Sequence, residues 1–555
     1  MSGELRVQRE PWRGNELLSY PERPASIVHI LDDVVRAHGA TEGLVDAHGR
    51  CTYDEFAMRV AGTAAALADR GLGRGAALGV VSPNSVDLAV LVFACAAAGV
   101  LMVGLSERGA PPRWARLLRT AGASAVAAAP GHHAAATSAA AAADLAEPAV
   151  MDLAELTRDR TLPWSFVRPD EGDTYAVVGT AGTTGPPKAS RVIHRCSVHS
   201  ALSYRSVLGL TSRDRTAVLF PLTYISALHA HVLPMMLAGG TSVLTTASRA
   251  HRFCDVLADE QITWMYTVPS FWLALLRTDR FSGIHLPHLR LAAFGGSAFP
   301  PDALGEIRRR FPEVALHNIY GLSETHSPAT ILRDDEFADR PTSVGRALPC
   351  MEARVVDATG AVVTTGDDGQ LQLRGSLVTT GYLGDAGATA AAFVDDGWFA
   401  TGDQARFDAE GYVWLLGRRH DLIIRGGFNI APVEVEQALR HHPGIADAAV
   451  FGVSDGIGDR AVACAIVRDD PALRPRAVRA WVRTQVGDYA VPRHVHFVDD
   501  IPLTAIGKID RGALAERLPG SPRRRRRHRR PGDTADHVEE RARFGPPRSG
   551  TLMPP

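Results

Sequence analysis

The alternation of helical segments with short apolar runs over residues 52–105 constrains the fold more than any other feature of the sequence. Apolar residues recur at helical spacing in FAMRVAGTAAALADRG and in LAVLVFACAAAG, and the short apolar runs AALGVVS and VLMVGL follow them. This order of helix, strand, helix and strand is typical of a parallel sheet covered by helices. The same alternation returns over residues 175–330, so we expect an α/β fold for the larger, N-terminal part of the chain.

One stretch of this region, Val86–Leu105, has about the length of a membrane span. It contains Asp87, is rich in Ala and Gly, and stands alone in the sequence. We therefore interpret it as a buried helix that runs into a buried strand, and we expect no membrane span.

The two remaining indicators of location agree with this interpretation. The first sixteen residues, MSGELRVQREPWRGNE, contain no apolar signal segment. The six cysteines lie far apart and form no CxxC pair, which argues against a zinc site and fits a reducing compartment. The sequence therefore predicts a cytoplasmic protein.

Composition changes along the chain predict its domain organisation. The Ala-rich residues 124–145 are expected to form a weak helix and a loop at the surface. Residues 343–416 contain short alternating strands with turn signals, typical of an antiparallel or barrel-like sheet, and residues 433–518 mix helices with strands. We predict three parts, with boundaries at 1–417, 418–518 and 519–555.

The last part is an Arg- and Pro-rich tail that we expect to be disordered. It carries ten Arg and four acidic residues, so the net charge of −1 for the whole chain becomes −7 for residues 1–518. An acidic body argues against nucleic acid as the main partner. Binding of the tail to nucleic acid or to a membrane is the alternative to a solvated tail.

Lysine usage points to two individual residues. Of the 60 basic residues only Lys188 and Lys508 are lysines. A compact ammonium and a planar guanidinium are not interchangeable beside a small anionic group. A chain that otherwise uses Arg is therefore expected to keep these two lysines for chemistry, the alternative being two stray surface residues.

Lys188 ends the first of five motifs, the string TAGTTGPPK at Thr180–Lys188, which follows the apolar run YAVV. Small residues let backbone N–H groups approach a polyphosphate, and the lysine supplies a point charge. Pro187 stands where a Walker A loop has Gly, so this is a different phosphate loop. The alternative is a mobile surface loop.

The second and third motifs carry groups suited to a nucleotide. In NIYGLSET, Asn318–Thr325, an aromatic ring can stack on a base and Glu324 can hold Mg²⁺ on phosphate oxygens. In GWFATGD, the carboxylate of Asp403 suits the two hydroxyls of a ribose, the alternative being an ordinary turn aspartate.

The last two motifs lie in the C-terminal part. The fourth consists of GRRHD from Gly417, IRGGFNI from Ile424 and PVEVE from Pro432. The fifth is PLTAIGKIDR at Pro502–Arg511, in which Lys508 follows a glycine in a turn that can reach another domain.

In this order and at these spacings, the five motifs resemble those of the adenylate-forming superfamily over residues 28–517. The superfamily includes acyl- and aryl-CoA ligases, luciferases and the adenylation domains of peptide synthetases. The resemblance implies an α/β fold: a large N-terminal domain of doubly wound sheets with a β-barrel-like subdomain, and a small mobile α+β C-terminal domain. It also implies two steps, in which a carboxylate attacks the α-phosphate of ATP and a thiol, usually of coenzyme A, then displaces AMP.

By motif position, the resemblance implies a role for each site residue. Lys188, Lys508 and Glu324 would be catalytic, with Lys508 bridging the carboxylate and the α-phosphate and Glu324 binding Mg²⁺. ATP or AMP would be bound by Thr180, Gly182, Thr183, Thr184, Gly185, Lys188, Gly296, Ser297, Ala298, Asn318, Tyr320, Gly321, Ser323, Asp403 and Arg418. A rotation about a hinge at His420 would replace Lys508 by the Gly426–Gly427 loop for the thiol step.

The acid is expected to bind beside a helix. The stretch PLTYISALH from Pro221 resembles the pocket helix of 4-coumarate–CoA ligases and other aryl ligases. Ile225 stands where amino-acid-activating members have Asp, and an unpaired buried ammonium is costly, which argues against amino acids. The pocket residues we expect are Tyr224, Ile225, His229, Phe294, Gly295 and Pro328, although His229 can equally be an ordinary buried histidine.

The sequence therefore predicts a ligase that activates a small carboxylic acid, first an aryl or arylacrylic acid and second a medium-chain fatty acid, with ATP, Mg²⁺ and coenzyme A. Three alternatives stay open. The acceptor can be a separate carrier protein or an amine, or an inorganic oxyanion can replace the carboxylate. A non-catalytic nucleotide-binding protein is the third, and the presence of both lysines and Glu324 argues against it.

Overall fold

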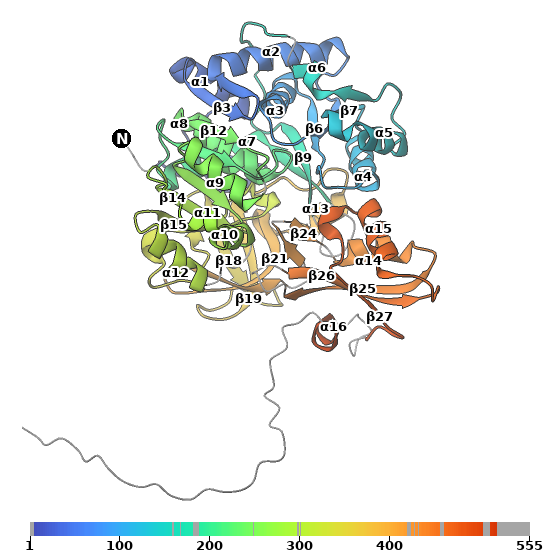
Figure 1. Cartoon of the computed structure of the whole chain (residues 1–555). Helices are drawn as coiled ribbons and strands as arrows, with labels where there is room; N and C mark the ends of the chain where they lie inside the picture. Colours follow the sequence, from blue (N-terminus) through green and yellow to red (C-terminus); the bar gives the residue numbers. More distant parts are fainter. Residues whose placement is uncertain are drawn as a thin grey trace, which may run out of the picture. The chain divides into compact units, whose positions relative to one another are not determined.

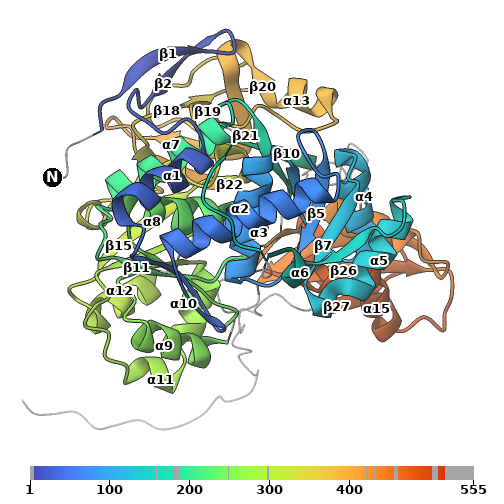
Figure 2. The ribbon, with the colours of Figure 1, turned by 90° about the horizontal axis from the view of Figure 1, so that it is seen from above.

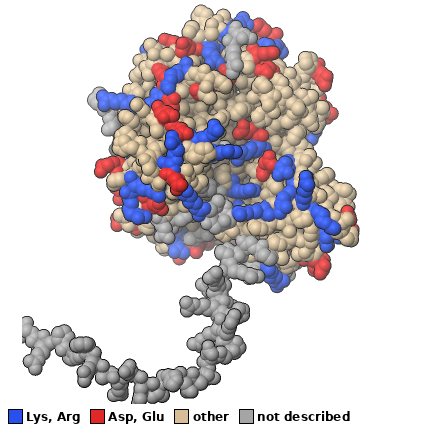
Figure 3. Space-filling view, viewed as in Figure 1, with Lys and Arg blue, Asp and Glu red and all other residues tan. Residues whose placement is uncertain are grey.

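Two sheets and the helices around them form the N-terminal part of the chain in a computed structural model (Figure 1). The structure describes residues 5–157, 160–166, 168–180, 188–247, 249–296, 299, 301–418, 423–426, 428–430, 432–454, 460–502 and 511–518. All of them belong to one compact unit. Basic and acidic side chains are both spread over the face of this unit that Figure 3 shows.

The apolar helix α3 (Val86–Ala98) lies between these two sheets (Figure 2). All but its last residue are buried, because α3 contacts β3 (Glu42–Asp46) of one sheet and β6 (Leu101–Gly104) and β9 (Thr174–Thr180) of the other. The prediction of a buried helix followed by a buried strand is confirmed. Within the described residues, no helix combines the length and apolar character needed to cross a membrane.

The first sheet has six strands, parallel except where β10 pairs antiparallel with β9. Its order is β10 (Lys188–Ile193), β9, β6, β5 (Ala77–Val81), β7 (Ala125–Ala128) and β8 (Val150–Asp152). The expectation of a surface helix and loop over 124–145 is wrong at its start, because β7 is a fully buried strand. Its neighbours β5 and β8 supply the backbone partners that its Ala-rich sequence does not announce.

The second sheet has nine strands with a parallel centre and antiparallel edges. Its order is β17 (Arg346–Ala347), β16 (Thr330–Leu332), β15 (Ala315–Tyr320), β14 (Leu291–Gly295), β13 (Trp264–Thr267), β11 (Arg215–Val218), β12 (Thr241–Leu244), β3 and β4 (Gly49–Thr52). Side chains of β12, β13 and β14 build a second core with helices of residues 250–310.

The helices of the N-terminal part pack around the two sheets. Helix α1 contacts α2, α3, α7 and α8, and α4 and α5 cover the first sheet. Their bounds are α1 (Ile27–His38), α2 (Tyr53–Asp69), α4 (Pro111–Ala121), α5 (His133–Ala142), α6 (Leu153–Thr157), α7 (His194–Val207), α8 (Leu233–Ala238), α9 (Ala250–Asp259), α10 (Pro269–Leu276), α11 (Asp279–Ser282) and α12 (Pro301–Arg310).

A third, antiparallel sheet follows, as predicted for residues 343–416. It consists of β18 (Met351–Val356), β19 (Gly369–Gly375), β21 (Trp398–Phe407), β20 (Phe393–Val394) and β22 (Val413–Arg418), with α13 (Ala386–Ala392) before β20. A hairpin of β1 (Gln8–Trp12) and β2 (Asn15–Ser19) contacts this sheet at β19.

The C-terminal part has its own core beneath a sheet of β25 (Ile445–Ser454), β26 (Arg460–Arg468) and β27 (His494–Phe497). Helices α14 (Pro432–Arg440) and α15 (Pro475–Gln485) pack on this core, and α16 (Arg511–Arg517) contacts β25. A short hairpin of β23 (Ile423–Arg425) and β24 (Phe428–Ile430) precedes them. The predicted class, an α/β chain with a large N-terminal part, a half-barrel sheet and a small C-terminal part, is confirmed.

Candidate active site

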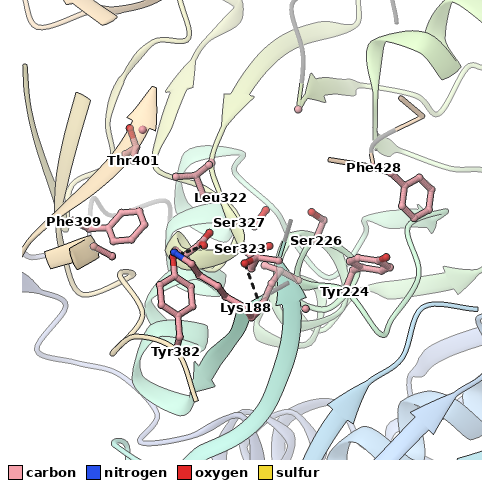
Figure 4. A pocket seen from close by; sticks show the side chains of 18 of the residues that line it. Lys188, Tyr224, Ser226, Leu322, Ser323, Ser327, Tyr382, Phe399, Thr401 and Phe428 are labelled. Atoms are coloured by element: carbon pink, nitrogen blue, oxygen red, sulfur yellow. Dashed lines mark hydrogen bonds between the residues drawn. The ribbon is translucent and has the colours of Figure 1, made fainter. Parts of the chain in front are cut away.

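A cavity of about 460 Å³ opens where the first sheet, the third sheet and the β23–β24 hairpin meet (Figure 4). Segments far apart in the sequence line it, including the ends of β9 and β10, the loop after β15, and Phe399–Gly402 of β21. Among the predicted site residues, those that line it are Thr180, Lys188, Tyr224, Ile225, Gly296, Gly321, Ser323, Glu324 and Gly426.

The sheet positions both ends of the predicted phosphate loop. Strand β9 ends at Thr180 and β10 begins at Lys188, and these two residues are direct partners in the antiparallel ladder. The Thr180 hydroxyl also donates to the carbonyl of Lys188 at 3.4 Å. The seven residues that connect them lie outside the described residues, including the predicted Gly182, Thr183, Thr184 and Gly185.

Tyr382, which lies in none of the five motifs, joins Lys188 to Glu324. The ammonium of Lys188 lies 4.8 Å from the ring centroid of Tyr382, and the Tyr382 hydroxyl donates to Glu324 Oε1 at 2.9 Å. Burial, helped by the charge of Glu324, raises the pKa of Tyr382, so its hydroxyl stays protonated and donates. Figure 4 shows the Lys188 and Tyr382 side chains side by side in the cavity.

The loop that carries Glu324 is held from beneath by a buried histidine. His326 Nε2 accepts from the backbone N–H of Ile193, and His326 Nδ1 bonds to the carbonyl of Leu377 at 3.0 Å. Burial lowers the pKa of His326 well below its usual value, so the ring is neutral and can serve both partners. Gly321 is required at the start of this loop, since a Cβ there would stand 1.3 Å from the Ser327 carbonyl oxygen.

Residues expected to hold adenine and ribose lie next to the Glu324 loop. The Tyr320 hydroxyl donates to Asp403 Oδ2 at 2.6 Å, and both side chains are buried. Arg418 is the backbone partner of Asp403 in the neighbouring strand. The amide of Asn318 instead donates to the carbonyl of Ser343 at 2.9 Å. Strand pairing therefore places Asp403 opposite Arg418, and Tyr320 and Asp403 directly adjoin Gly321 and Gly402, which line the cavity.

The opposite side of the cavity is mainly aromatic and apolar. The rings of Phe220 and Tyr266 lie 5.2 Å apart, and Tyr224 meets Phe428 edge-on at 5.9 Å. Pro221, Ile225 and Ser226 complete this wall. The polypeptide makes a π-helical turn over Ala227–Val232 directly after it, a distortion that is frequent at functional sites.

Four predicted pocket residues lie outside this lining. His229 is buried behind it, bonded to the Ile225 carbonyl and to Ser197 Oγ, both at 2.8 Å, and burial lowers its pKa to about 4. Phe294 packs on Phe299 in the second core. Gly295 lies in β14, and Pro328 follows the Glu324 loop.

Several lining residues were not predicted from the sequence. Tyr382, Tyr266 and Phe220 contribute rings, and Arg113 and Tyr489 come from opposite parts of the chain. Only two of these five residues could have been found from the sequence. Phe220 directly precedes the predicted pocket helix, and Tyr382 ends a glycine-rich stretch. Of the remaining predicted residues, Ser297, Ala298, His420, Gly427 and Lys508 lie outside the described residues.

Known proteins resemble this chain in sequence and in fold. The AMP-binding enzyme family matches residues 31–383, and the AMP-binding enzyme C-terminal domain matches residues 434–508. A feruloyl-CoA synthase of Amycolatopsis sp is 31% identical over 489 residues, covering 87% of this chain and 98% of that protein. An indoleacetate–CoA ligase of Aromatoleum aromaticum is 29% identical over 475 residues, covering 82% and 91%. The solved structure of an amide bond synthetase from Marinactinospora thermotolerans is 28% identical, with a TM-score of 0.81, covering 88% of this chain and 99% of that one.

Proposed function

We propose that this chain, which belongs to the AMP-binding family of enzymes, activates an aryl or arylacrylic acid with ATP and transfers the acyl group to coenzyme A. Family membership makes it an ATP-dependent, AMP-forming ligase. The acid, the acceptor and the residue roles are the proposal. The observation that carries it is the aromatic wall of Phe220, Tyr224 and Tyr266 in the same cavity as Lys188 and Glu324.

In the first step an oxygen of the acid attacks the α-phosphate, and the bond to pyrophosphate breaks. Both reactants are anions, so catalysis consists mainly of positioning and charge neutralisation. We assign Lys188 and Thr180 to the terminal phosphates and Lys508 to the carboxylate and α-phosphate. Tyr320 and Asp403 are assigned to the adenosine.

Glu324 suits a magnesium ion carried by the nucleotide. Tyr382 engages its Oε1, which orients the carboxylate into the cavity. Mg²⁺ usually binds one or two carboxylates together with substrate phosphates and keeps several waters. A single carboxylate therefore fits, and the ion would neutralise charge on the phosphates. Within the described residues, no three metal-binding side chains gather elsewhere.

In the second step the thiol sulfur attacks the acyl carbon and AMP leaves. We assign this step to the arrangement in which Gly426 and Phe428 line the cavity. A glycine at the hairpin tip leaves room for an acceptor chain beside the acyl group.

The acid side argues for a flat, neutral body on the substrate. Among the described lining residues Glu324 is the only carboxylate, and Ile225 is apolar and buried. An ammonium beside Ile225 would stay unpaired, which is costly. Ser226 and Ser327 offer hydroxyls to a polar ring substituent, as on a hydroxycinnamate.

Product analysis tests the acceptor. Purified enzyme with ATP, magnesium, 4-hydroxycinnamic acid and coenzyme A is expected to form AMP and a thioester, identified by mass spectrometry. Lys508→Ala is expected to form neither. AMP formation without any thioester would overturn the assignment of coenzyme A.

Transfer to an amine is the second candidate. The likeness to an amide bond synthetase over nearly its whole length favours it. The same reaction with an amine in place of coenzyme A separates the two candidates. An amide formed faster than the thioester would identify an amine as the acceptor.

A further inference from the structure

The N-terminal and C-terminal parts of the compact unit meet through their backbones beside the cavity. Gly109, in the loop before α4, forms an isolated antiparallel bridge with Gly487, in the turn after α15. The N–H of Ala110 donates to the Val486 carbonyl at 3.3 Å, and the N–H of Asp488 donates to the Arg108 carbonyl at 3.2 Å. Gly487 has a φ of 133°, and a Cβ there would lie 2.3 Å from the Arg108 carbonyl oxygen. This approach is therefore open to glycine alone without rearrangement.

A buried ion pair lies next to this backbone contact. Arg113 of α4 and Glu434 of α14 are joined at 2.5 Å, and their side chains are only 10% and 9% exposed. Arg113 also donates to the Tyr489 hydroxyl, and its guanidinium carbon lies 5.4 Å from the Tyr489 ring centroid. Burial lowers the pKa of Arg113, but the charge of Glu434 outweighs this and holds it above its usual value. Arg113 is therefore charged, and its contact with Glu434 spans the two parts.

Tyr489 connects the Arg113–Glu434 ion pair to the cavity. Its ring stacks on Phe428 at 5.2 Å, and the same Phe428 ring meets Tyr224 of the acid pocket. Arg425 of the hairpin donates to the carbonyls of Tyr489 and Val491 at 3.4 and 3.1 Å. The β23–β24 hairpin is thereby fixed to the segment that Arg113 holds. Figure 4 shows Phe428 beside Tyr224 at one side of the cavity.

We infer that Arg113 and Glu434 form an interdomain latch, which holds the β23–β24 hairpin at the cavity for acyl transfer and is released for adenylate formation. Both are positioning residues, since they act through Tyr489 and Phe428. The inference rests on the proposed function, in which Lys508 serves the first step and the Gly426 hairpin the second.

A buried ion pair has the energetics that such a latch needs. The desolvation of two charges offsets much of their attraction, so a formed pair adds little net stability. Removing one partner, however, leaves an uncompensated buried charge and is strongly unfavourable. The pair therefore selects one orientation of the two parts without locking them. A second arrangement, with both groups in water, stays accessible for the first step.

Two half-reactions measured on full-length variants test the latch. We choose Arg113→Met, Glu434→Gln and the double variant, with Arg116→Met as control, because Arg116 is exposed on the same helix. Adenylate formation is followed by acid-dependent ATP–pyrophosphate exchange. Transfer is followed by single-turnover reaction of preformed acyl-adenylate with coenzyme A, and circular dichroism establishes folding.

We expect exchange within about twofold of the parent enzyme in Glu434→Gln, because Glu434 is not among the lining residues of the cavity. Transfer is expected to be slowed about 100-fold in each single variant, as for misplaced reacting groups. The double variant is expected to be no slower than the worse single variant, because the two residues act as one unit. Arg116→Met should leave both rates unchanged.

An equal loss of both half-reactions in folded Arg113→Met and Glu434→Gln would overturn the latch, and so would unchanged transfer. Failure of the proposed function is distinguishable, since the parent enzyme would then show no exchange with any acid. In that case the latch is tested by small-angle scattering of the ligand-free parent enzyme and of the two single variants. A changed scattering profile in both single variants supports the latch, and profiles identical to that of the parent enzyme overturn it.

Discussion

The two sides of the cavity are built on different principles. On the nucleotide side, Lys188, Tyr382 and Glu324 form a chain of charged and hydrogen-bonded contacts. On the acid side, Phe220, Tyr224 and Tyr266 contribute ring faces and edges, with Ser226 among them. Phosphate chemistry needs particular charges at particular places, whereas an apolar acid needs a shape. The nucleotide side therefore depends on the identity of its charged residues, whereas the acid side depends on the size and shape of the space that its rings leave.

The supports beneath the two sides differ as well. The Glu324 loop takes a strained path, with φ values of 52° at His326 and 90° at Ser327, and the His326 ring ties it to Ile193 and Leu377. The acid side rests on helical backbone with a π-helical turn. The Glu324 loop is therefore held by backbone groups of two other segments, whereas the acid wall depends on the path of one helical segment.

The largest effect is expected from Glu324→Gln, which keeps the shape of the nucleotide side and removes its charge. Adenylate formation should fall about 100- to 1,000-fold, the usual loss for a removed electrostatic contact to reacting charge. Exchange rates at several magnesium concentrations measure it. Glu155→Gln, an exposed control, should have no effect. A loss smaller than about threefold would contradict the assignment of Glu324.

Phe220→Ala opens the acid side without touching charge. We expect kcat/KM for cinnamates to fall about 10- to 100-fold, since hydrophobic pockets discriminate by this amount. A medium-chain fatty acid, which does not need a flat slot, should lose less. Exchange kinetics with both acids measure the ratio. Equal losses for the two acids would show that Phe220 does not shape the acid pocket.

Tyr382→Phe separates the ring from the hydroxyl on the nucleotide side. The ring stays beneath Lys188, whereas the hydrogen bond to Glu324 is lost. A hydrogen bond to a charged group is worth about 1.5–3 kcal/mol, so we expect adenylate formation to slow about 10-fold or more. Tyr382→Ala should be slower still. If both variants match the parent enzyme, Tyr382 does not orient Glu324.

The smallest effect is one of pH on stability, through the histidines behind the two sides. Burial lowers the pKa of His229 to about 4, so between that pH and its unfolded pKa near 6.5 the unfolded chain binds more protons. The free energy of unfolding should therefore fall as pH falls below 6.5. Each such buried histidine changes the free energy of unfolding by up to about 1.4 kcal/mol per pH unit.

Urea unfolding between pH 7.5 and 5 measures this slope. His229→Gln should flatten it, and the exposed control His285→Gln should leave it unchanged. Equal slopes in His229→Gln and in the parent protein would show that His229 is not a neutral buried group.

The sequence predicted the nucleotide side better than the acid side because its residues lie in contiguous strings. Lys188 and Glu324 each stand in a motif on one strand end or one loop, so spacing along the chain maps directly onto space. Tyr266 and Arg113 stand in no motif and reach the cavity only through the sheet order and the contact of two parts. A single sequence contains no signal for such encounters.

The fold also has features that follow from contiguous sequence and features that depend on distant partners. Helix α3 was predictable because an all-round apolar helix must be buried, and two sheets bury it. Strand β7 was missed because Ala125–Ala128 favours a helix by composition, whereas its place between β5 and β8 makes it a strand.

Acid-dependent ATP–pyrophosphate exchange tests the central claim most directly. The panel contains benzoates, cinnamates, fatty acids and amino acids, with Lys508→Ala as control. We predict exchange with aryl or arylacrylic acids that exceeds exchange with amino acids at least 100-fold and is lost in Lys508→Ala. Exchange driven best by an amino acid, or no exchange with any acid, would contradict the account.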